Sequence, residues 1–232
     1  MSKEIHVYLT DDNIAVIEGD QTAKHVCDSR RLDVWREALE PLRHYIPVGG
    51  VVIDVGAYIG DHTITFLNMV GETGKVYAFE PNPVAMQCMR HNLRDYDNAV
   101  KMQCALGQAH TWASLILDSG DMSACRVVGD PKGKVTITTL DTVTQMFTRL
   151  DFLKIDAEGH EALILNAAKE TLMRFRPSLL IEMNPFMLGK YGFETEDVHG
   201  RLTRLNYVYA GDYGGDGNHS DILYIPKERG VK

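Results

Sequence analysis

The chain has 232 residues, of which 44% are apolar, and this is enough for one α/β domain with a sizeable core plus a short extension. Its formal net charge of −8 repels polyanions, so we expect neither nucleic acid nor an anionic membrane as a partner. No run approaches the ~20 apolar residues that a bilayer span requires, and the start lacks the pattern of a secretory leader. We therefore expect a cytoplasmic protein; the sequence leaves its oligomeric state open, a homo-oligomer included.

Residues 1–46 are predicted to form an N-terminal extension built from a hairpin and a helix. Residues 5–18 alternate weakly in polarity around a turn-forming Asp-Asp-Asn stretch, which favours a hairpin. Between Arg30 and Tyr45, leucines and a tryptophan recur at helical spacing and predict one helix that packs on the rest of the chain.

Residues 47–232 are predicted to form the main domain, an α/β fold. Strand-like and helix-like segments alternate along it, an order that favours a mainly parallel sheet with helices on both faces. An irregular insert with two strand-like runs interrupts this order, and the last two runs are expected to form a hairpin. The predicted strands are 51–55, 75–80, 99–106, 112–118 and 135–140 (the insert), 152–157, 178–183, 207–210 and 222–226, and the predicted helices include 86–93, 163–173 and 198–205.

The strongest local signal is the glycine turn DVGAYIGD, which begins at Asp54 and lies where a buried strand turns into a helix. Glycines at such a place let the backbone turn tightly and approach a ligand closely. The next strand ends at Glu80, 20 residues after Gly60, which is the spacing at which an acid can bind ribose hydroxyls. Together these features predict a nucleoside site.

The charge of the turn indicates which nucleoside is bound. Dinucleotide sites aim helix N–H groups at a pyrophosphate through G-x-G-x-x-G, whereas here three residues separate Gly56 from Gly60. Asp54 and Asp61 flank the turn; two carboxylates repel a pyrophosphate but favour the sulfonium and ammonium groups of S-adenosylmethionine, so we predict that cofactor. The simpler alternatives are that Asp54 caps the helix turn and that Glu80 is a solvated residue before a proline turn.

Five sequence blocks resemble the FkbM-type S-adenosylmethionine-dependent methyltransferases: VVIDVGAYIGDHT, VYAFEPNP, the short TLD at 139–141, DFLKIDAEGHE and PSLLIEMNP, in this order from Val51 to Pro185. The resemblance implies a Rossmann-like class I methyltransferase fold with a mainly parallel seven-stranded sheet and an antiparallel last strand. It also implies O-methylation of a hydroxyl on a sugar, polyketide or related small molecule. Tyr58 departs from the family pattern, which usually has Asn there.

The resemblance also assigns roles to matched positions. Asp54, Gly56 and Gly60 are expected on the methionine and ribose side, with Glu80 holding the ribose and the Asp156 loop facing the transferred methyl group. The full set assigned to the cofactor is Asp54, Gly56, Tyr58, Gly60, His62, Thr63, Glu80, Pro81, Ala105 and Asp156.

Asp156, Glu158 and His160 are the predicted catalytic residues, because they follow a strand at the carboxyl end, where ligands sit in open parallel sheets. Methyl transfer to a hydroxyl is an in-line displacement that needs oriented reactants and a nearby base. His160 titrates nearest neutrality and is the predicted base, with Asp156 or Glu158 orienting it or contacting substrate. The structural alternative is that Glu158 only favours a helix start and Gly159 only allows a turn.

Glu182 and Asn184 end the next strand and are predicted to contact the substrate. With Asp156 they also offer oxygen ligands to a divalent metal such as Mg²⁺, but this ligand set is incomplete, so no metal ligand is assigned. Two other functions stay open: a non-catalytic module that uses a nucleoside pocket to regulate a partner, and a nicotinamide-dependent oxidoreductase, which the missing third glycine opposes. The favoured prediction is a methyltransferase acting on a small-molecule or glycan acceptor.

Overall fold

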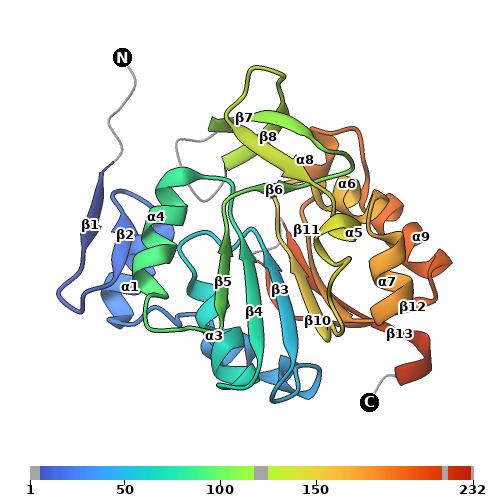
Figure 1. The fold of residues 1–232 in the computed structure, drawn as a ribbon, viewed down its shortest axis with the longest axis horizontal. Helices are drawn as coiled ribbons and strands as arrows, with labels where there is room; N and C mark the ends of the chain where they lie inside the picture. Colours follow the sequence, from blue (N-terminus) through green and yellow to red (C-terminus); the bar gives the residue numbers. More distant parts are fainter. Residues whose placement is uncertain (1–5, 118–124, 216–218, 231–232) are drawn as a thin grey trace.

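The computed structural model describes residues 6–117, 125–215 and 219–230, and it begins with an N-terminal segment that lies beside the main sheet (Figure 1). Its first two strands, β1 (Val7–Leu9) and β2 (Ala15–Ile17), pair antiparallel and confirm the predicted hairpin. The single helix predicted over 30–45 is wrong. The segment instead contains α1 (Gln21–Ser29), α2 (Arg36–Leu39) and the 3₁₀ helix η1 (Glu40–His44).

Local chemistry explains this division. The Asp20 carboxylate accepts a hydrogen bond from the Ala23 N–H and caps the start of α1. Arg30 adopts a left-handed conformation, with φ of 58°, and ends that helix. Pro41 has no N–H to donate and falls in the first turn of η1, so a continuous helix through this position is disfavoured.

The main sheet has seven strands in the order β12-β13-β11-β10-β3-β4-β5, and it confirms the predicted fold class. All neighbouring pairs from β11 to β5 are parallel, and β13 is antiparallel to both β11 and β12, so the predicted C-terminal hairpin is also confirmed. The chain leaves β3 toward β4 on one side and returns to β10 on the other, which makes the carboxyl end of β3 a topological switch point. The strands are β3 (Val51–Val55), β4 (Lys75–Phe79), β5 (Ala99–Met102), β10 (Phe152–Ile155), β11 (Ser178–Met183), β12 (Tyr207–Asp212) and β13 (Ser220–Pro226).

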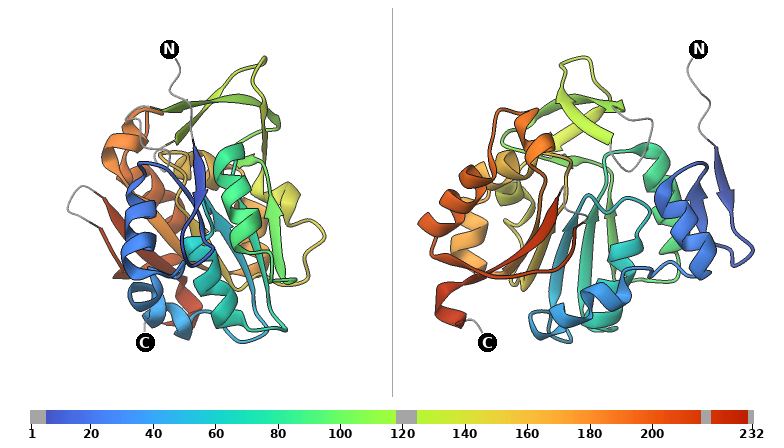
Figure 2. Two further views of the ribbon diagram at one scale, coloured as in Figure 1. Left: turned by 90° about the vertical axis from the view of Figure 1, so that its left-hand side faces the viewer. Right: turned by 180° about the vertical axis from the view of Figure 1, so that it is seen from behind.

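Helices cover both faces of this sheet (Figure 2). Alternate strand residues point to opposite faces, so Val52 joins the core under α3 whereas Ile53 joins the core on the other face. Val16 and Leu42 of the N-terminal segment belong to the same core as Val52, so this segment packs as part of the domain. The helices are α3 (Asp61–Val70), α4 (Pro83–Asn92), α5 (Leu140–Val143), α6 (Glu161–Asn166), α7 (Lys169–Phe175), α8 (Pro185–Gly189) and α9 (Thr195–Arg204), followed by η2 (Lys227–Arg229).

The helix predicted over 163–173 is divided into α6 and α7, and a distant side chain stabilises the break. The Asp141 carboxylate accepts hydrogen bonds from the backbone N–H groups of Glu170 (3.2 Å) and Thr171 (2.8 Å), and so caps the first turn of α7. This contact also gives the short TLD block a structural role.

The predicted insert is a separate four-stranded sheet, in the order β6-β9-β7-β8, that stands over the upper edge of the main sheet in Figure 1. The predicted strand 99–106 is split, because Gln103 and Cys104 leave β5 and the chain crosses into the insert. The third strand of the insert along the chain was not predicted. The insert strands are β6 (Ala105–Leu106), β7 (Thr111–Leu117), β8 (Cys125–Gly129) and β9 (Val135–Thr138). Within the described ranges, no helix combines the length and the apolar character that a membrane span needs.

Candidate active site

A cavity of about 480 Å³ opens at the switch point, between the carboxyl ends of the main strands, the insert and the N-terminal segment. Most of the predicted site residues meet there. The predicted residues that line it are Gly56, Tyr58, His62, Glu80, Pro81, Ala105, Asp156, Glu158, His160 and Glu182, whereas Asp54, Gly60, Thr63 and Asn184 do not line it.

The glycine turn needs glycine for two different reasons. Gly56 has φ of +77°, and a Cβ added there would lie 1.7 Å from the backbone oxygen of Asp156, so only glycine lets these two loops approach. Gly60 has φ of +93° and immediately precedes α3, so its role is to let the chain enter the helix. The turn is therefore held against the β10 loop at the centre of the cavity.

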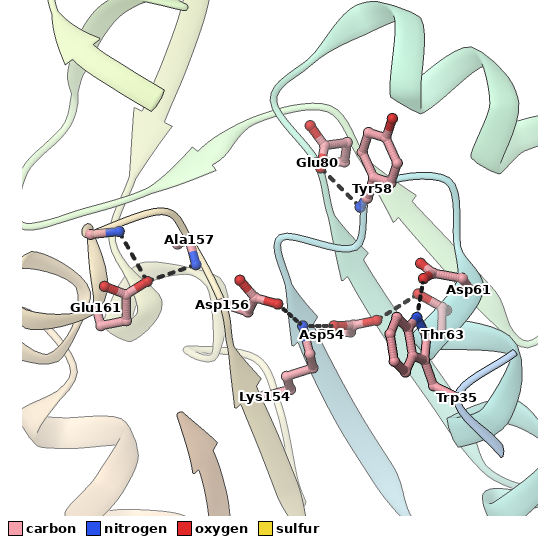
Figure 3. Close-up of polar contacts among 11 residues, drawn as sticks. Trp35, Asp54, Tyr58, Asp61, Thr63, Glu80, Lys154, Asp156, Ala157 and Glu161 are labelled. Atoms are coloured by element: carbon pink, nitrogen blue, oxygen red, sulfur yellow. Dashed lines mark hydrogen bonds and ion pairs between the residues drawn. The ribbon is translucent and has the colours of Figure 1, made fainter. Parts of the chain in front are cut away.

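Glu80 is fixed at the end of β4 with its carboxylate toward the cavity (Figure 3). Its two oxygens accept hydrogen bonds from the backbone N–H groups of Tyr58 (2.9 Å) and Asn82 (2.7 Å). Burial raises the pKa of Glu80 to about 7, although the two N–H groups oppose this. With 6% exposure, Glu80 is not the solvated residue of the simpler alternative, and its remaining lone pairs can accept hydroxyl groups.

Asp54 lies beneath the turn and not in the cavity. It is fully buried, accepts a hydrogen bond from the Thr63 hydroxyl (2.6 Å), and pairs across the strands with Lys154 at 3.8 Å. Alternation along β3 explains this, because Asp54 points to the same face as Val52, toward α3. Its hydrogen bond comes from the Thr63 side chain and not from a backbone N–H of the helix turn, and Asp54 does not line the cavity.

Lys154 is a buried cation that the sequence analysis missed. Its ammonium lies 2.9 Å from the Asp156 carboxylate, and its side chain is 1% exposed. Burial lowers the pKa of Lys154, but the charges of Asp156 and Asp54 outweigh burial and hold it above the ordinary value. For Asp156, burial raises the pKa, but the positive charge and the hydrogen bond of Lys154 act against burial, and the net pKa is below the ordinary value. Asp156 is therefore ionised at the floor of the cavity. The sequence feature that could have indicated this ion pair is the lysine within the apolar strand FLKI, because a buried cation needs a carboxylate partner.

The β10–α6 loop contains all three predicted catalytic residues, and Glu158 and His160 follow Asp156 in it. Glu158 has φ of 53°, and the buried Glu161 carboxylate accepts hydrogen bonds from Ala157 and Gly159, which hold this conformation. His160 is 5% exposed, and its Nδ1 lies 3.2 Å from the Leu106 carbonyl of the insert. A neutral imidazole carries one N–H group; when Nδ1 donates it to the Leu106 carbonyl, Nε2 is the nitrogen that can take a proton. Burial lowers the pKa of His160, so the ring is neutral.

Asn184 is placed outside the predicted site. Its side-chain oxygen accepts a hydrogen bond from the Met187 N–H (3.2 Å) and caps α8. The predicted substrate contact is thus left to Glu182. Among the described residues, no group of three or more His, Cys, Asp or Glu side chains is arranged to hold a metal ion.

The N-terminal segment forms a wall of the cavity. The sequence alone left open whether this segment covers the site or packs behind it. The Tyr58 hydroxyl donates a hydrogen bond to the Asp20 carboxylate, and the Trp35 indole N–H donates to Asp61 at 2.7 Å. Both bonds tie this segment to the glycine turn and α3 (the second is drawn in Figure 3). Tyr58 thus makes a contact with a part of the chain that precedes the turn. The residues of the segment that line the cavity are Gln21, Thr22, His25, Trp35, Ala38 and Leu39.

Replacement Tyr58→Phe is expected to lower the free energy of unfolding by about 1–2 kcal/mol, since it removes one hydrogen bond to a buried carboxylate. It should also speed amide hydrogen exchange in α1, whose cap is the same Asp20. Urea denaturation and exchange mass spectrometry check both effects. Tyr209→Phe is the matched control, because Tyr209 is 55% exposed; equal behaviour of the two variants would contradict the assigned role of the hydroxyl.

The ligand-free protein is expected to lose stability as the pH rises from about 5 to about 7. In this window the native state holds protons on buried acids that the unfolded chain has released, so the free energy of unfolding falls with rising pH. His62 and His160 act in the opposite direction because burial lowers their pKa, but they are fewer than the acids. Burial raises the pKa of Asp61 to about 6, of Glu80 and Glu161 to about 7, and of Glu182 to about 11.

Urea denaturation at pH 5, 6 and 7 measures this slope. Glu161→Gln keeps the oxygen that accepts from Ala157 but cannot titrate, so it should flatten the slope, whereas the exposed Glu72→Gln should leave it unchanged. Stability that increases over this interval would refute the expectation.

Comparison with known proteins agrees with this geometry. Residues 54–209 match a family model described as the methyltransferase FkbM domain. Comparison with curated protein sequences gives no significant match. Among solved structures, the chain is similar to methyltransferase FkbM from Methylobacillus flagellatus KT, with a TM-score of 0.54 and 16% identity, over 88% of this chain and 52% of that one. The chain thus spans about half the length of that protein.

Two further structures share the fold. Fibrillarin from Aeropyrum pernix, solved with natively bound S-adenosyl-L-methionine, has a TM-score of 0.53 and 14% identity, over 95% of this chain and 94% of that one. A putative rRNA methylase from Clostridium thermocellum has a TM-score of 0.54 and 10% identity, over 82% of this chain and 93% of that one. At such identities the likeness establishes the fold alone.

The family match covers about two thirds of the chain and includes Gly56, Glu80, Asp156 and His160, four of the residues that line the cavity. The seven-stranded sheet is that of the class I methyltransferases to which it is similar. The chain therefore belongs to the FkbM methyltransferase family.

Proposed function

We propose that the protein transfers the methyl group of S-adenosylmethionine to a hydroxyl oxygen of a small molecule or glycan. The observation that carries this proposal is the placement of Glu80 and the ionised Asp156 on opposite sides of Gly56 in one cavity. The protein groups in the cavity fit this cofactor. The carboxylate at the end of β4 can accept hydrogen bonds from the two ribose hydroxyls, and the anionic floor favours the sulfonium. The same acids repel a pyrophosphate, which argues against a nicotinamide cofactor.

When bound, S-adenosylmethionine supplies a methyl group that leaves sulfur with its bonding electron pair remaining there, as the new O–CH₃ bond forms. The chain has to align the acceptor oxygen and remove its proton. Asp156 is placed to orient the acceptor hydroxyl, because Lys154 holds its carboxylate in position. His160 Nε2 accepts the proton, and the carbonyls of Leu106 and Val127, which raise the His160 pKa, stabilise the imidazolium that results.

The acceptor is expected to be a small molecule or glycan and not a nucleic acid. The net charge of −8 and the acidic cavity both disfavour a polyanion. An acceptor bound in this cavity would contact the N-terminal segment and the insert, which both line it.

Calorimetry with S-adenosylmethionine, S-adenosylhomocysteine and NAD tests the cofactor. We expect binding of the first two, and tight binding of NAD alone would overturn the proposal. Incubation with the donor and a metabolite extract, followed by mass spectrometry, should then find metabolites that gain the mass of one CH₂ group. A product methylated on nitrogen or carbon, or on RNA, would refute the assigned acceptor, and cofactor binding without turnover on any acceptor would indicate a regulatory module.

A further inference from the structure

Two acids face each other at the end of the cavity farthest from Glu80. Glu182 of β11 and Asp221 of β13 are direct partners in the antiparallel register, and both line the cavity. Side chains of such partners leave the same face of a sheet with their Cβ atoms about 4.5–5.5 Å apart. Like charges directly opposite are destabilising, so the fold alone gives no reason for this pair.

Glu182 carries an unused hydrogen-bonding group. It is 8% exposed, and its Oε2 atom is buried and has no hydrogen-bond partner. Glu182 lines the cavity, and a buried polar oxygen without a partner on such a side chain is costly unless a ligand satisfies it. The acidic pair is therefore supported by a second and independent feature that points to a ligand.

The charge around the pair is predominantly negative. Burial, followed by the neighbouring carboxylates, raises the pKa of Glu182 to about 11, so it holds a proton at neutral pH. Burial also raises the pKa of Asp221. The charged and titratable groups that face the pair come from β10, the β10–α6 loop, α6, the end of β12 and the β12–β13 loop: Lys154, Asp156, Glu158, Glu161, Asp212 and His219.

The pair lies on the acceptor side of the cavity. In the order β13-β11-β10-β3-β4, three strand spacings separate β11 from β4, which is about 14 Å at about 4.8 Å per spacing. Glu80 ends β4, and Gly56 and Asp156 follow the two strands in between. We place the ribose of the donor at Glu80 and its sulfur beside Gly56, and we assign Glu182 and Asp221, which lie beyond Asp156 in this order, to the acceptor.

We propose that Glu182 and Asp221 form an ammonium-binding subsite, so that the acceptor carries a protonated primary amine, as in an amino sugar, near the hydroxyl that is methylated. This inference rests on the proposed function and specifies its substrate class. An ammonium offers three donors and no acceptor, which complements a cluster of carboxyl oxygens. Phosphate and sulfate groups are repelled by the charge of the neighbouring Asp156 carboxylate.

Binding of the amine should expel the proton of Glu182, because a nearby ammonium favours the carboxylate. The proton passes to the buffer, and the charge-assisted hydrogen bond that forms is stronger than one to a neutral hydroxyl. We therefore expect tighter binding of amines than of their N-acetylated forms, together with measurable proton release.

The test uses the full-length protein saturated with S-adenosylhomocysteine and titrated calorimetrically with three matched pairs: glucosamine, galactosamine and ethanolamine, each against its N-acetyl form. In at least one pair the amine should bind tenfold or more tightly, about the effect of one charge-assisted hydrogen bond. Titrations at pH 7 in buffers of different ionisation enthalpy measure the released proton. Glu182→Gln and Asp221→Asn should each remove the preference, and Glu182→Gln should also remove the proton release, whereas Glu72→Gln, an exposed change, should preserve both.

Amines that bind no more tightly than their acetylated forms in all three pairs, or a preference that survives in both variants, would overturn the subsite. Titration with MgCl₂ alone is the competing experiment: Mg²⁺ binding that Glu182→Gln abolishes would replace the ammonium with a divalent metal and overturn the proposal. Binding of S-adenosylhomocysteine is measured separately. Its absence would contradict the proposed function, whereas its presence without an amine preference would contradict the subsite alone.

Discussion

Replacement Lys154→Met is expected to lower the free energy of unfolding by about 3–5 kcal/mol, because it leaves the buried Asp54 carboxylate and the partly exposed Asp156 carboxylate without their cation. Asp54 is fully buried and lies 3.8 Å from the Lys154 ammonium, while Asp156 lies 2.9 Å from it. Methionine has a similar length and fits an apolar strand, so loss of packing contributes little. Urea denaturation followed by circular dichroism measures the difference.

Two variants distinguish charge from packing in this experiment. The double variant Asp54→Asn and Lys154→Met also removes one of the carboxylates that Lys154 pairs with. It should therefore recover part of the lost free energy of unfolding, so the effects of the two changes should not be additive. Lys132→Met alters an exposed lysine and should change stability by less than about 0.5 kcal/mol. A Lys154→Met protein as stable as the wild type would refute the buried ion-pair network.

Replacement Glu80→Ala is expected to raise the Kd for S-adenosylmethionine about 100-fold. Two hydrogen bonds from ribose hydroxyls to a carboxylate together contribute about 3 kcal/mol, and every 1.4 kcal/mol is about tenfold in affinity. The change also frees the N–H groups of Tyr58 and Asn82, so the turn loses an anchor. Calorimetry at pH 8 gives the affinity.

The pH dependence of S-adenosylmethionine binding tests whether the Glu80 carboxylate is the group that contacts the ribose. Burial raises the pKa of Glu80 to about 7 in the ligand-free cavity, so wild-type affinity should increase as the pH rises through about 7, where the better acceptor forms. Glu80→Ala should bind with little dependence on pH in this interval. The exposed Glu196→Ala should retain wild-type affinity, and an equal loss in both variants would contradict a role in ribose binding.

The sequence predicted which residues meet at the centre of the cavity because their placement depends on local features. Gly56 lies at a strand-to-helix turn and Glu80 at the end of the next strand, and the parallel topology alone brings both to one edge of the sheet. Asp156 follows for the same reason. In each case the residue type, its place relative to a strand and the strand order were enough.

The remaining features depend on contacts between distant parts of the chain. Alternation along β3 turns Asp54 away from the cavity toward Lys154, and this partner is 100 positions later in the chain. The break between α6 and α7 depends on Asp141, which lies outside both helices. The periodicity of apolar residues along the chain predicts neither of these contacts. It also does not predict the hydrogen bond between Tyr58 and Asp20.

The two bonds from the N-terminal segment to the glycine turn and α3 have an evolutionary consequence. The FkbM match begins at residue 54, yet Gln21, Thr22 and His25 line the cavity and are encoded ahead of it. Under the proposed function, substitutions of these wall residues would change which acceptors fit the cavity while Gly56, Glu80 and Asp156 are unchanged. This wall can thus vary in sequence separately from the cavity residues that the family match includes.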